Sequence, residues 1–274
     1  MIRDITIGQY YPAKSILHRL DPRVKIVGTL LYLISLFLFN SLLGYLVTTL
    51  FLVAIIRLSK VPFSYIMRGM KPIMMILLIT LLFNLFLTRQ GDVLFHAWIF
   101  TITEGGLRTA VYMAIRLVYL ITGSSLMTFT TTPNELTDGI ERLLRPLNKI
   151  HVPVHEIAMM MSIALRFIPI LLEETDKIMK AQIARGADLE SGNILQKAKA
   201  MIPILVPLFV SAFRRANDLA MAMEARCYRG GDGRTKMKPL HYTSRDIRAY
   251  VILVVYLVGV VAIGRLIPFH IWIF

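Results

Sequence analysis

Acidic and histidine side chains, which most often hold metals or carry acid–base catalysis, are not grouped in this chain in a pattern suited to either task. The densest acidic cluster is Glu173, Glu174 and Asp176, and no second cluster matches it. Lys177 and Lys180 lie within a helical turn of these acids, which favours salt bridges between helices over metal binding. An enzyme that holds magnesium on a diphosphate needs paired acids, and no Asp-x-x-Asp pair occurs. The sequence predicts no catalytic residue and no metal site.

Histidine, cysteine and nucleotide-binding patterns lead to the same expectation. The six histidines are scattered, and Pro153 lies between His151 and His155, which weakens a helical metal pair. The single cysteine, Cys227, excludes an internal disulfide and any cysteine-cluster metal site. No Gly-x-x-x-x-Gly-Lys-Ser/Thr sequence occurs, so any dependence on ATP must come from other chains. We therefore expect the chain itself to bind no cofactor.

Two arginines occupy matching positions near the ends of predicted helices. Arg185 and Arg226 each end an Ala-x-x-Ala-Arg sequence that follows an Ile-Pro-Ile-Leu sequence. The separation from proline to arginine is 16 residues in one case (Pro169 to Arg185) and 23 in the other (Pro203 to Arg226). The difference of 7 is close to two helical turns, so each arginine has a similar azimuth relative to its proline. The flanking residues are all small: Ala184, Gly186, Ala225 and Cys227.

An arginine at such a helix tip can recognise a carboxylate on another protein. Its planar guanidinium takes a carboxylate with two hydrogen bonds and keeps its charge when desolvated. Small neighbours allow the tip to enter a groove of the partner. The plainer alternative is that each arginine binds the last carbonyls of its own helix and complements the helix dipole. Two matching sites in one region favour partner binding more than either site would alone.

The elements that must position these arginines are three helical segments. Thr132 and Pro133 are typical of a helix start, and Pro169 is expected to bend the second segment. Gly186 is a natural end for the second segment, and the adjacent Gly230 and Gly231 for the third. The expected segments are about 132–147, 153–186 and 194–231.

The composition of the chain indicates a membrane protein. Hydrophobic residues make up 56% of the 274 residues and the mean hydropathy is +0.62, above the roughly 45–50% apolar share of soluble domains. Lys and Arg number 31 against 17 Asp and Glu, a net charge of +14. On an apolar chain this excess is most simply the positive bias of cytoplasmic loops, so the sequence predicts no nucleic-acid partner.

Five membrane spans are expected. The apolar stretch 24–56 would reach about 50 Å as one helix, well beyond a hydrocarbon core of about 30 Å, so we interpret it as two spans joined near Asn40–Gly44. The acid-free connection 57–71 is expected on the cytoplasmic side. Arg116 lies well inside a span, where pairing with a buried acid or a carbonyl, or snorkelling, is favoured over substrate binding. The other spans are about 72–87, 105–129 and 247–269.

The region after the fourth span differs in character from the rest. Residues 131–245 hold 17 Lys and Arg and 12 Asp and Glu, more than half of all charges. We predict an all-α polytopic membrane protein with an N-terminal membrane domain of four spans (1–130), a cytoplasmic domain of long coupling helices (131–245) and a C-terminal span (246–274). The N-terminus is expected in the cytoplasm and the C-terminus outside.

The sequence resembles the transmembrane T component of energy-coupling factor (ECF) transporters, the EcfT/CbiQ family of bacterial micronutrient importers. The resemblance spans nearly the whole chain. It depends on four segments that match the family's motifs, of which the two arginine segments correspond to its paired coupling motifs: 20–25 (Leu-Asp-Pro-Arg-Val-Lys), 162–169 (Ser-Ile-Ala-Leu-Arg-Phe-Ile-Pro), 184–186 and 225–228. Cys227 stands where another small residue is expected, and its size preserves the reach of the motif.

The resemblance implies a scaffold in the bacterial plasma membrane that joins two ABC-type ATPases to a small substrate-binding S component. Arg185 and Arg226 would each dock in a groove of one ATPase, and nucleotide-driven closure would move the two helices. ATP and magnesium would be bound by the ATPases, and this chain would perform no chemistry. The transported vitamin or metal would be chosen by the S component.

The sequence supports two interpretations of the methionines on the long helices equally. They either contact the S component, since thioethers adapt to different partner surfaces, or they fill the core. The residues expected at such a contact are Met159, Met160, Met161, Met201 and Met221.

Two other classes of function are weighed against the scaffold. A membrane-embedded transferase would need paired acids, which this chain lacks. A self-contained secondary transporter would place most of the chain in spans with an inverted repeat, whereas here residues 131–245 are expected in the cytoplasm.

Overall fold

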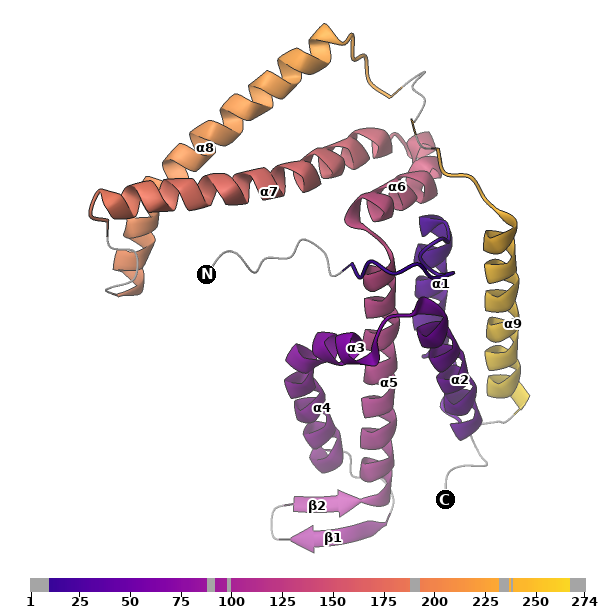
Figure 1. Ribbon diagram of the computed structural model, residues 1–274. Helices are drawn as coiled ribbons and strands as arrows, with labels where there is room; N and C mark the ends of the chain where they lie inside the picture. The colour runs from indigo at the N-terminus through magenta and orange to yellow at the C-terminus, as the bar shows by residue number, and fades with distance from the viewer. Residues whose placement is uncertain are drawn as a thin grey trace. The chain divides into compact units, whose positions relative to one another are not determined.

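The computed structural model describes residues 10–87, 92–97, 100–187, 193–231, 237 and 239–266. These residues are overwhelmingly helical, which confirms the predicted all-α class (Figure 1). The chain divides into two compact units, which we call the bundle unit (Gly8–Ile140 with Leu240–Phe274) and the arm unit (Glu141–Pro239). The helices are α1 (Pro22–Ser35), α2 (Leu42–Ser59), α3 (Phe63–Met70), α4 (Met74–Leu87), α5 (Glu104–Thr130), α6 (Pro133–Leu144), α7 (Val154–Ala184), α8 (Ile194–Ala225) and α9 (Ser244–Leu266), with short 3₁₀ segments at Lys71–Ile73 and Arg145–Ile150.

One short hairpin departs from the helical pattern. Strands β1 (Val93–Ala97) and β2 (Phe100–Thr103) pair antiparallel between α4 and α5, with Val93 opposite Thr103 and Ala97 opposite Phe100. This segment lies between the expected spans 72–87 and 105–129, where only a connection was predicted. The local composition of Val, Ile, Thr and Phe suits a pleated strand and explains the hairpin.

The bundle unit has its core between α1, α2, α5 and α9. Tyr32, Leu36, Leu52, Tyr256 and Val260 are buried together there. Hydroxyls lie among the apolar side chains and satisfy one another, with the Ser35 Oγ and the Tyr256 Oη 2.9 Å apart. The same tyrosine hydroxyl lies 3.3 Å from the Thr48 Oγ1.

Hydroxyl side chains on α5 are satisfied within their own helix. The Thr122 Oγ1 donates to the Val118 carbonyl, and the Thr130 Oγ1 donates to the Leu126 carbonyl, at 2.7 and 2.9 Å. The Ser124 hydroxyl donates to the Leu120 carbonyl in the same way. These bonds one turn back satisfy the three hydroxyl donors without a partner from another helix.

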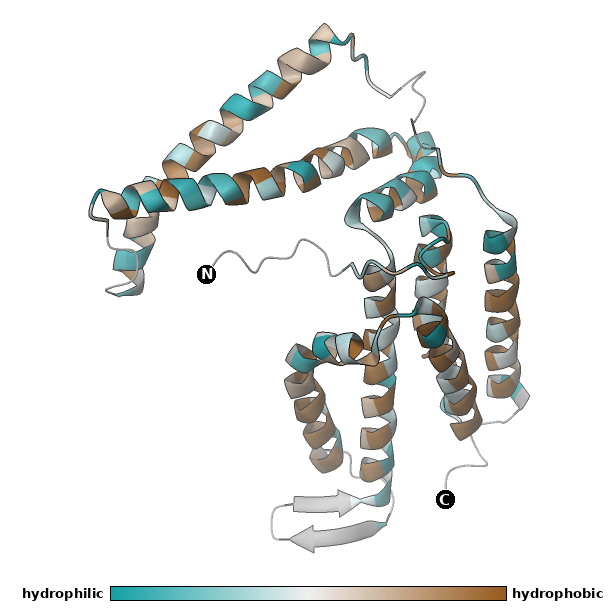
Figure 2. Cartoon of the chain, in the orientation of Figure 1, coloured by the Kyte–Doolittle hydropathy of each residue, from teal (hydrophilic) through white to brown (hydrophobic). Residues whose placement is uncertain are grey.

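Among the described residues, five helices are long and apolar enough to cross a membrane, so the chain is a multi-pass membrane protein. They are α2, α5, α7, α8 and α9. Helices α2, α5 and α9 correspond to expected spans, whereas α7 and α8 were expected to be cytoplasmic helices. Helix α1 has only 14 residues, about 21 Å at 1.5 Å per residue. The expected span at 72–87 corresponds to α4, which forms a bent pair with α3 at 63°, and this pair would add a sixth crossing. Figure 2 shows α2 and α4 as mostly apolar, whereas polar and apolar residues alternate along α7 and α8.

Arg116, the arginine inside α5, finds a carbonyl partner. Its guanidinium donates to the Phe39 carbonyl at 3.2 Å and to the Asn40 side-chain carbonyl. It also lies over the Phe37 ring, 5.5 Å from the centroid. The carbonyl pairing expected from the sequence is therefore observed, and Arg116 holds the turn between α1 and α2 against α5.

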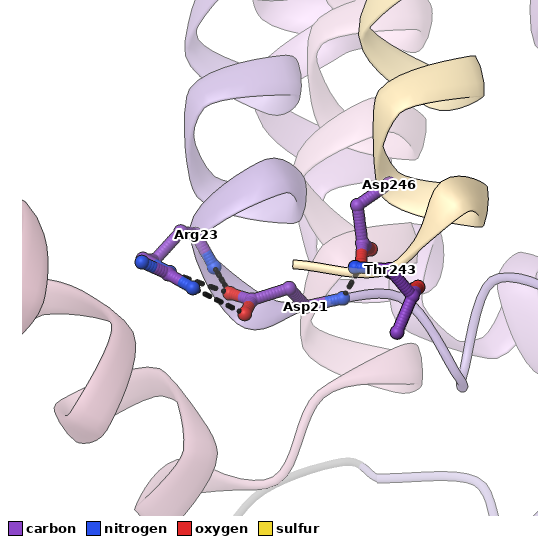
Figure 3. A network of polar contacts seen from close by, with 4 residues as sticks. All are labelled: Asp21, Arg23, Thr243 and Asp246. Carbon is purple, nitrogen blue, oxygen red and sulfur yellow. Dashed lines mark hydrogen bonds and ion pairs between the residues drawn. The ribbon is translucent and has the colours of Figure 1, made fainter. Parts of the chain in front are cut away.

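A polar network joins the start of α1 to the start of α9 (Figure 3). Asp21 is the N-cap of α1, and its carboxylate accepts from the Arg23 backbone N–H at 2.9 Å and from the Arg23 guanidinium at 2.8 and 3.0 Å. The Asp246 carboxylate accepts from the Asp21 N–H at 2.8 Å, and from the N–H and hydroxyl of Thr243, both at 2.7 Å. Asp246 is only 1% exposed. The Leu-Asp-Pro-Arg sequence thus caps α1 and fixes it to α9.

Candidate interaction site at the tips of two long helices

Helices α7 and α8 form the frame of the arm unit. They have 31 and 32 residues, and both continue past internal prolines: Pro169 in α7, and Pro203 and Pro207 in α8. The Asn193 side chain and the Gln196 side chain form a capping box that starts α8. Both starts lie where the sequence placed them, within a residue of Pro153 and Ile194.

The two long helices are joined by polar contacts. The Glu174 carboxylate on α7 forms an ion pair with Arg215 on α8 and accepts from the Ser211 hydroxyl at 3.1 Å. The Gln182 side chain on α7 donates to the Pro203 carbonyl on α8 at 3.3 Å. A salt bridge between the long helices was predicted for the acidic cluster and is confirmed for Glu174, although its partner is an arginine of α8 and not a nearby lysine.

Arg185 is the C-cap of α7. The helix ends at Ala184, and Gly186 follows with φ +86°. The Gly186 N–H donates to the Ile183 carbonyl at 2.9 Å, and the Ala187 N–H donates to the Gln182 carbonyl at 3.0 Å. This pair of bonds is a Schellman motif, which requires a left-handed residue directly after the C-cap. The predicted end at Gly186 is confirmed.

Arg226 is the C-cap of α8 in the same motif. The Cys227 N–H donates to the Glu224 carbonyl at 2.8 Å, and the Tyr228 N–H donates to the Met223 carbonyl at 3.0 Å. Cys227 takes the left-handed position with φ +56°. The prediction that Gly230 and Gly231 end this helix is therefore wrong, because Cys227 adopts the conformation for which glycine was expected.

The side chains at both tips are exposed. This holds for the two arginines and for the small residues around them: Ala184, Gly186, Ala225 and Cys227. In the described part of the chain, no carboxylate lies within ion-pair distance of Arg185 or Arg226. Each guanidinium therefore keeps its donors available to a partner.

The two tips lie at different ends of the arm unit. Helix α7 alone is about 46 Å long at 1.5 Å per residue. Figure 1 shows α8 crossing α7 and its C-terminal end pointing away from that of α7. Gly231, just beyond the tip of α8, packs against the His155 ring in the first turn of α7, where a Cβ on the glycine would lie 2.5 Å from the ring. The two arginines are therefore displayed at separate places on the arm unit.

His151 and His155, which were considered as a metal-binding pair, have different structural roles. His151 has φ +60° and ends the 3₁₀ segment before α7. His155 lies on α7 and its Nδ1 is 3.0 Å from the Glu141 carboxylate. His155 therefore holds Glu141 on one side and the loop after α8 on the other, an arrangement that the sequence pattern did not reveal.

Four of the five methionines expected at a partner contact are exposed. The exposed fractions range from 40% for Met161 to 60% for Met221, and Met159 is half-buried. A stripe of apolar side chains on α8, each more than half exposed, accompanies them: Ile202, Leu205, Val206, Phe209, Val210 and Phe213. We call these six residues the α8 stripe. Sequence analysis did not name them, although their spacing of three and four residues is the signal of one helix face.

Comparison with known proteins places the chain in a family. The family described as Cobalt transport protein (CbiQ) matches residues 13–237. A Clostridium kluyveri protein named energy-coupling factor transporter transmembrane protein EcfT is 60% identical over 250 residues, covering 91% of this chain and 93% of the relative. Proteins of the same name from Thermosediminibacter oceani (51% identical, 99% and 100% covered) and Bacillus subtilis (50% identical, 93% and 96% covered) are similar along nearly their whole length. The chain therefore belongs to the CbiQ family, which confirms its resemblance to the transmembrane components of ECF transporters.

Proposed function

We propose that this chain is the scaffold and energy-coupling subunit of an ECF-type ABC importer for a vitamin or transition metal. In this role it transmits the ATP-driven motion of two ATPase subunits to a substrate-binding S component. The observation that carries the proposal is the identical capping of two exposed arginines, Arg185 and Arg226, at the separate tips of α7 and α8.

The geometry of each tip suits a docking contact. The Schellman motif fixes the backbone of the C-cap, so the arginine leaves the helix in the same direction at both tips. An acidic groove on each ATPase would receive one guanidinium, and the small flanking residues allow close approach. Because the motif ends a continuous helix, displacement of the tip moves the helix as one body.

The contacts between α7 and α8 support transmission of that motion. Glu174, Arg215 and Ser211 join the helices at one point, and Gln182 and Pro203 join them at another. Two connections resist sliding and rotation better than one. Because sliding and rotation are restricted, the motion that remains is a change in the angle between α7 and α8, which the two ATPases would produce together.

The exposed apolar surface of α8 suits the S component. The α8 stripe and the exposed methionines offer an apolar face with adaptable thioethers. In this proposal the chain is not an enzyme, and ATP and magnesium belong to the ATPases. In this proposal residues 131–245 lie on the cytoplasmic side, so α7 and α8 do not cross the membrane although they are long and apolar enough to do so. The N-terminus is also cytoplasmic, and the C-terminus lies outside.

A charge-reversal experiment tests the docking contact. Arg185→Glu and Arg226→Glu are each expected to weaken retention of an ATPase by about 30-fold or more, because loss of one partner of a buried charge pair costs about 2 kcal/mol or more. The double variant should insert in the membrane and lose transport. Arg214→Glu, on an exposed position of α8 away from the tip, is the matched control. Unchanged transport in the double variant would refute the docking contact.

The single cysteine provides a second test without changing the tip. Cys227 is exposed beside Arg226, so a maleimide should label it quickly in the isolated chain and slowly in the complex with ATPases. A Cys227→Ala, Asn217→Cys variant moves the thiol to an exposed position of α8 and should be labelled equally in both states. Equal labelling of Cys227 in both states would contradict burial of this tip.

Purification in mild detergent with mass spectrometry of the partners tests the class of function. Recovery of two ABC-type ATPases and a small membrane protein is expected. Recovery of this chain alone would favour the transferase or the secondary transporter. Tags at Gly231 and Phe274 test the orientation, with Gly231 expected inside and Phe274 outside, and the reverse pattern of protection would overturn it.

A further inference from the structure

The bundle unit contains a cavity of about 430 Å³ between α1, α2, α5, α9 and the turn that precedes α1. This volume lies within the range of about 300–1,000 Å³ typical of small-molecule sites. Its inner wall is apolar and includes Gly28, Tyr32, Phe51, Leu52 and Gly123. A soluble polar ligand would find few hydrogen-bond partners on this wall, whereas a hydrocarbon chain would be well matched to it.

Three basic residues line the same cavity: Lys25, Arg245 and Arg248. The Lys25 ammonium donates to the Thr130 carbonyl at 2.8 Å and to the His18 carbonyl at 3.3 Å. The Arg248 Nε donates to the Ser244 carbonyl at 3.3 Å. Within the described ranges, none of the three cations has a carboxylate within ion-pair distance.

The acid nearest in sequence does not neutralise these cations. Asp246 lies between the two arginines on α9, but its carboxylate is buried and bonded to the Asp21 N–H and to Thr243. Arg245 and Arg248 are exposed on the same turn of the helix. A net positive charge therefore remains at the cavity and favours an anionic group.

The basic and apolar parts of the cavity are ordered along the bundle. Lys25 and Arg245 lie in the first turns of α1 and α9, whereas Tyr32 and Leu253 lie about two turns further along the same helices. The wall residue Leu58 comes from the last turn of α2, and Thr130 ends α5. The cations thus stand at one end of the bundle, where the helices begin or end, and the apolar wall extends from there toward the middle of the bundle.

We propose that this cavity binds one anionic phospholipid. The phosphate lies at Arg245 and Arg248, with Lys25 adding positive charge, and an acyl chain extends along Tyr32 and Phe51. Charge complementarity selects an anionic headgroup, and the apolar wall selects a lipid over a free anion. This site is separate from the helix tips, and its test does not depend on the proposed transport function.

Native mass spectrometry of the full chain in mild detergent tests the site. After delipidation, the protein is titrated with phosphatidylglycerol and with phosphatidylcholine that have the same acyl chains. One phosphatidylglycerol should bind at least about tenfold more tightly than phosphatidylcholine. Arg245→Ala with Arg248→Ala should weaken its binding roughly 25-fold, because each basic side chain contributes about fivefold. The control Arg265→Ala, on the same helix but away from the cavity, should bind as the wild type does.

A second pair of variants tests the acyl-chain part of the site. Ala249→Phe places a ring in the cavity wall and should reduce binding of either lipid, whereas Val255→Phe, at a 66% exposed position of α9, should not. Equal affinity for the two lipids would refute the proposal. So would unchanged affinity in the double arginine variant, unchanged affinity in Ala249→Phe, or full competition by inorganic phosphate.

Discussion

The buried carboxylate of Asp246 is expected to be the most sensitive single position for attachment of α9 to the bundle. It accepts three hydrogen bonds, and one of them comes from the backbone N–H of Asp21, 225 residues away in sequence. Asp246→Asn keeps the volume but replaces one oxygen by an NH₂ group. Whichever way the amide is turned, a donor then faces the N–H of Asp21 or of Thr243.

The expected loss follows from those contacts. A hydrogen bond to a charged group contributes about 1.5–3 kcal/mol, and a buried donor left without an acceptor costs about 1–3 kcal/mol. Asp246→Asn loses the charge and at least one acceptor, so the free energy of unfolding should fall by about 2–4 kcal/mol. Thr243→Ala removes one hydroxyl bond and keeps the backbone bond, so it should lose only about 1 kcal/mol.

Two measurements check this expectation. Unfolding by SDS in mild detergent micelles, followed by circular dichroism, gives the change in global free energy. Hydrogen exchange of the peptide that contains the Asp21 amide reports the bond itself, and exchange should accelerate in Asp246→Asn. Asp218→Asn, on an exposed position of α8, should change stability by less than about 0.5 kcal/mol. A variant Asp246→Asn that unfolds like the wild type, with its Asp21 amide still protected, would refute the reasoning.

Glycine and cysteine positions give two further predictions of opposite sign. At the helix tips, Cys227→Gly should slow hydrogen exchange of the last turn of α8 by up to about fivefold, because glycine adopts the left-handed conformation without the strain of a side chain. Gly186→Ala introduces that strain and should accelerate exchange of the last turn of α7 by a similar factor. Equal effects in the same direction would contradict the shared motif. In the bundle, Gly123→Ala should lower the unfolding free energy by about 1–3 kcal/mol, because its Cβ would lie 2.4 Å from the Tyr32 ring. The added Cβ of Gly259→Ala on α9 meets nothing within 4 Å, so this variant should be neutral or stabilising by up to about 1 kcal/mol. If Gly259→Ala loses as much unfolding free energy in SDS as Gly123→Ala, overpacking is not the cause of the loss in Gly123→Ala.

The helices of the arm unit could be predicted well from sequence because their signals are local. Proline, capping side chains and Gly186 act within one turn, and they place the starts of α7 and α8 and the end of α7. The end of α8 could not be placed, because a left-handed cysteine has no clear local signal. Only the hydrogen bonds of Cys227 and Tyr228 reveal it.

Contacts between distant residues could not be predicted. Nothing in the sequence around Asp246 indicates that it receives the N–H of Asp21, and the partner of Glu174 proved to be Arg215, 41 residues away. The choice of spans was also limited, since hydropathy alone does not separate a spanning helix from an apolar helix such as α8 that exposes one face. The candidate site was predicted from residue type and from the matching spacing of its two arginines, whereas the shared Schellman capping of both tips is visible only in the backbone geometry.

The two kinds of hydroxyl bond in the bundle unit have a consequence for biogenesis. Hydroxyls of Thr122 and Thr130 are satisfied as soon as α5 is helical, so this helix can leave the translocon and enter lipid without waiting for a neighbour. The bonds of Tyr256 with Ser35 and Thr48 need three helices from both ends of the chain. Helix α9, which is synthesised after α1 and α2, therefore completes them, and assembly of the bundle is a step that follows insertion of its helices.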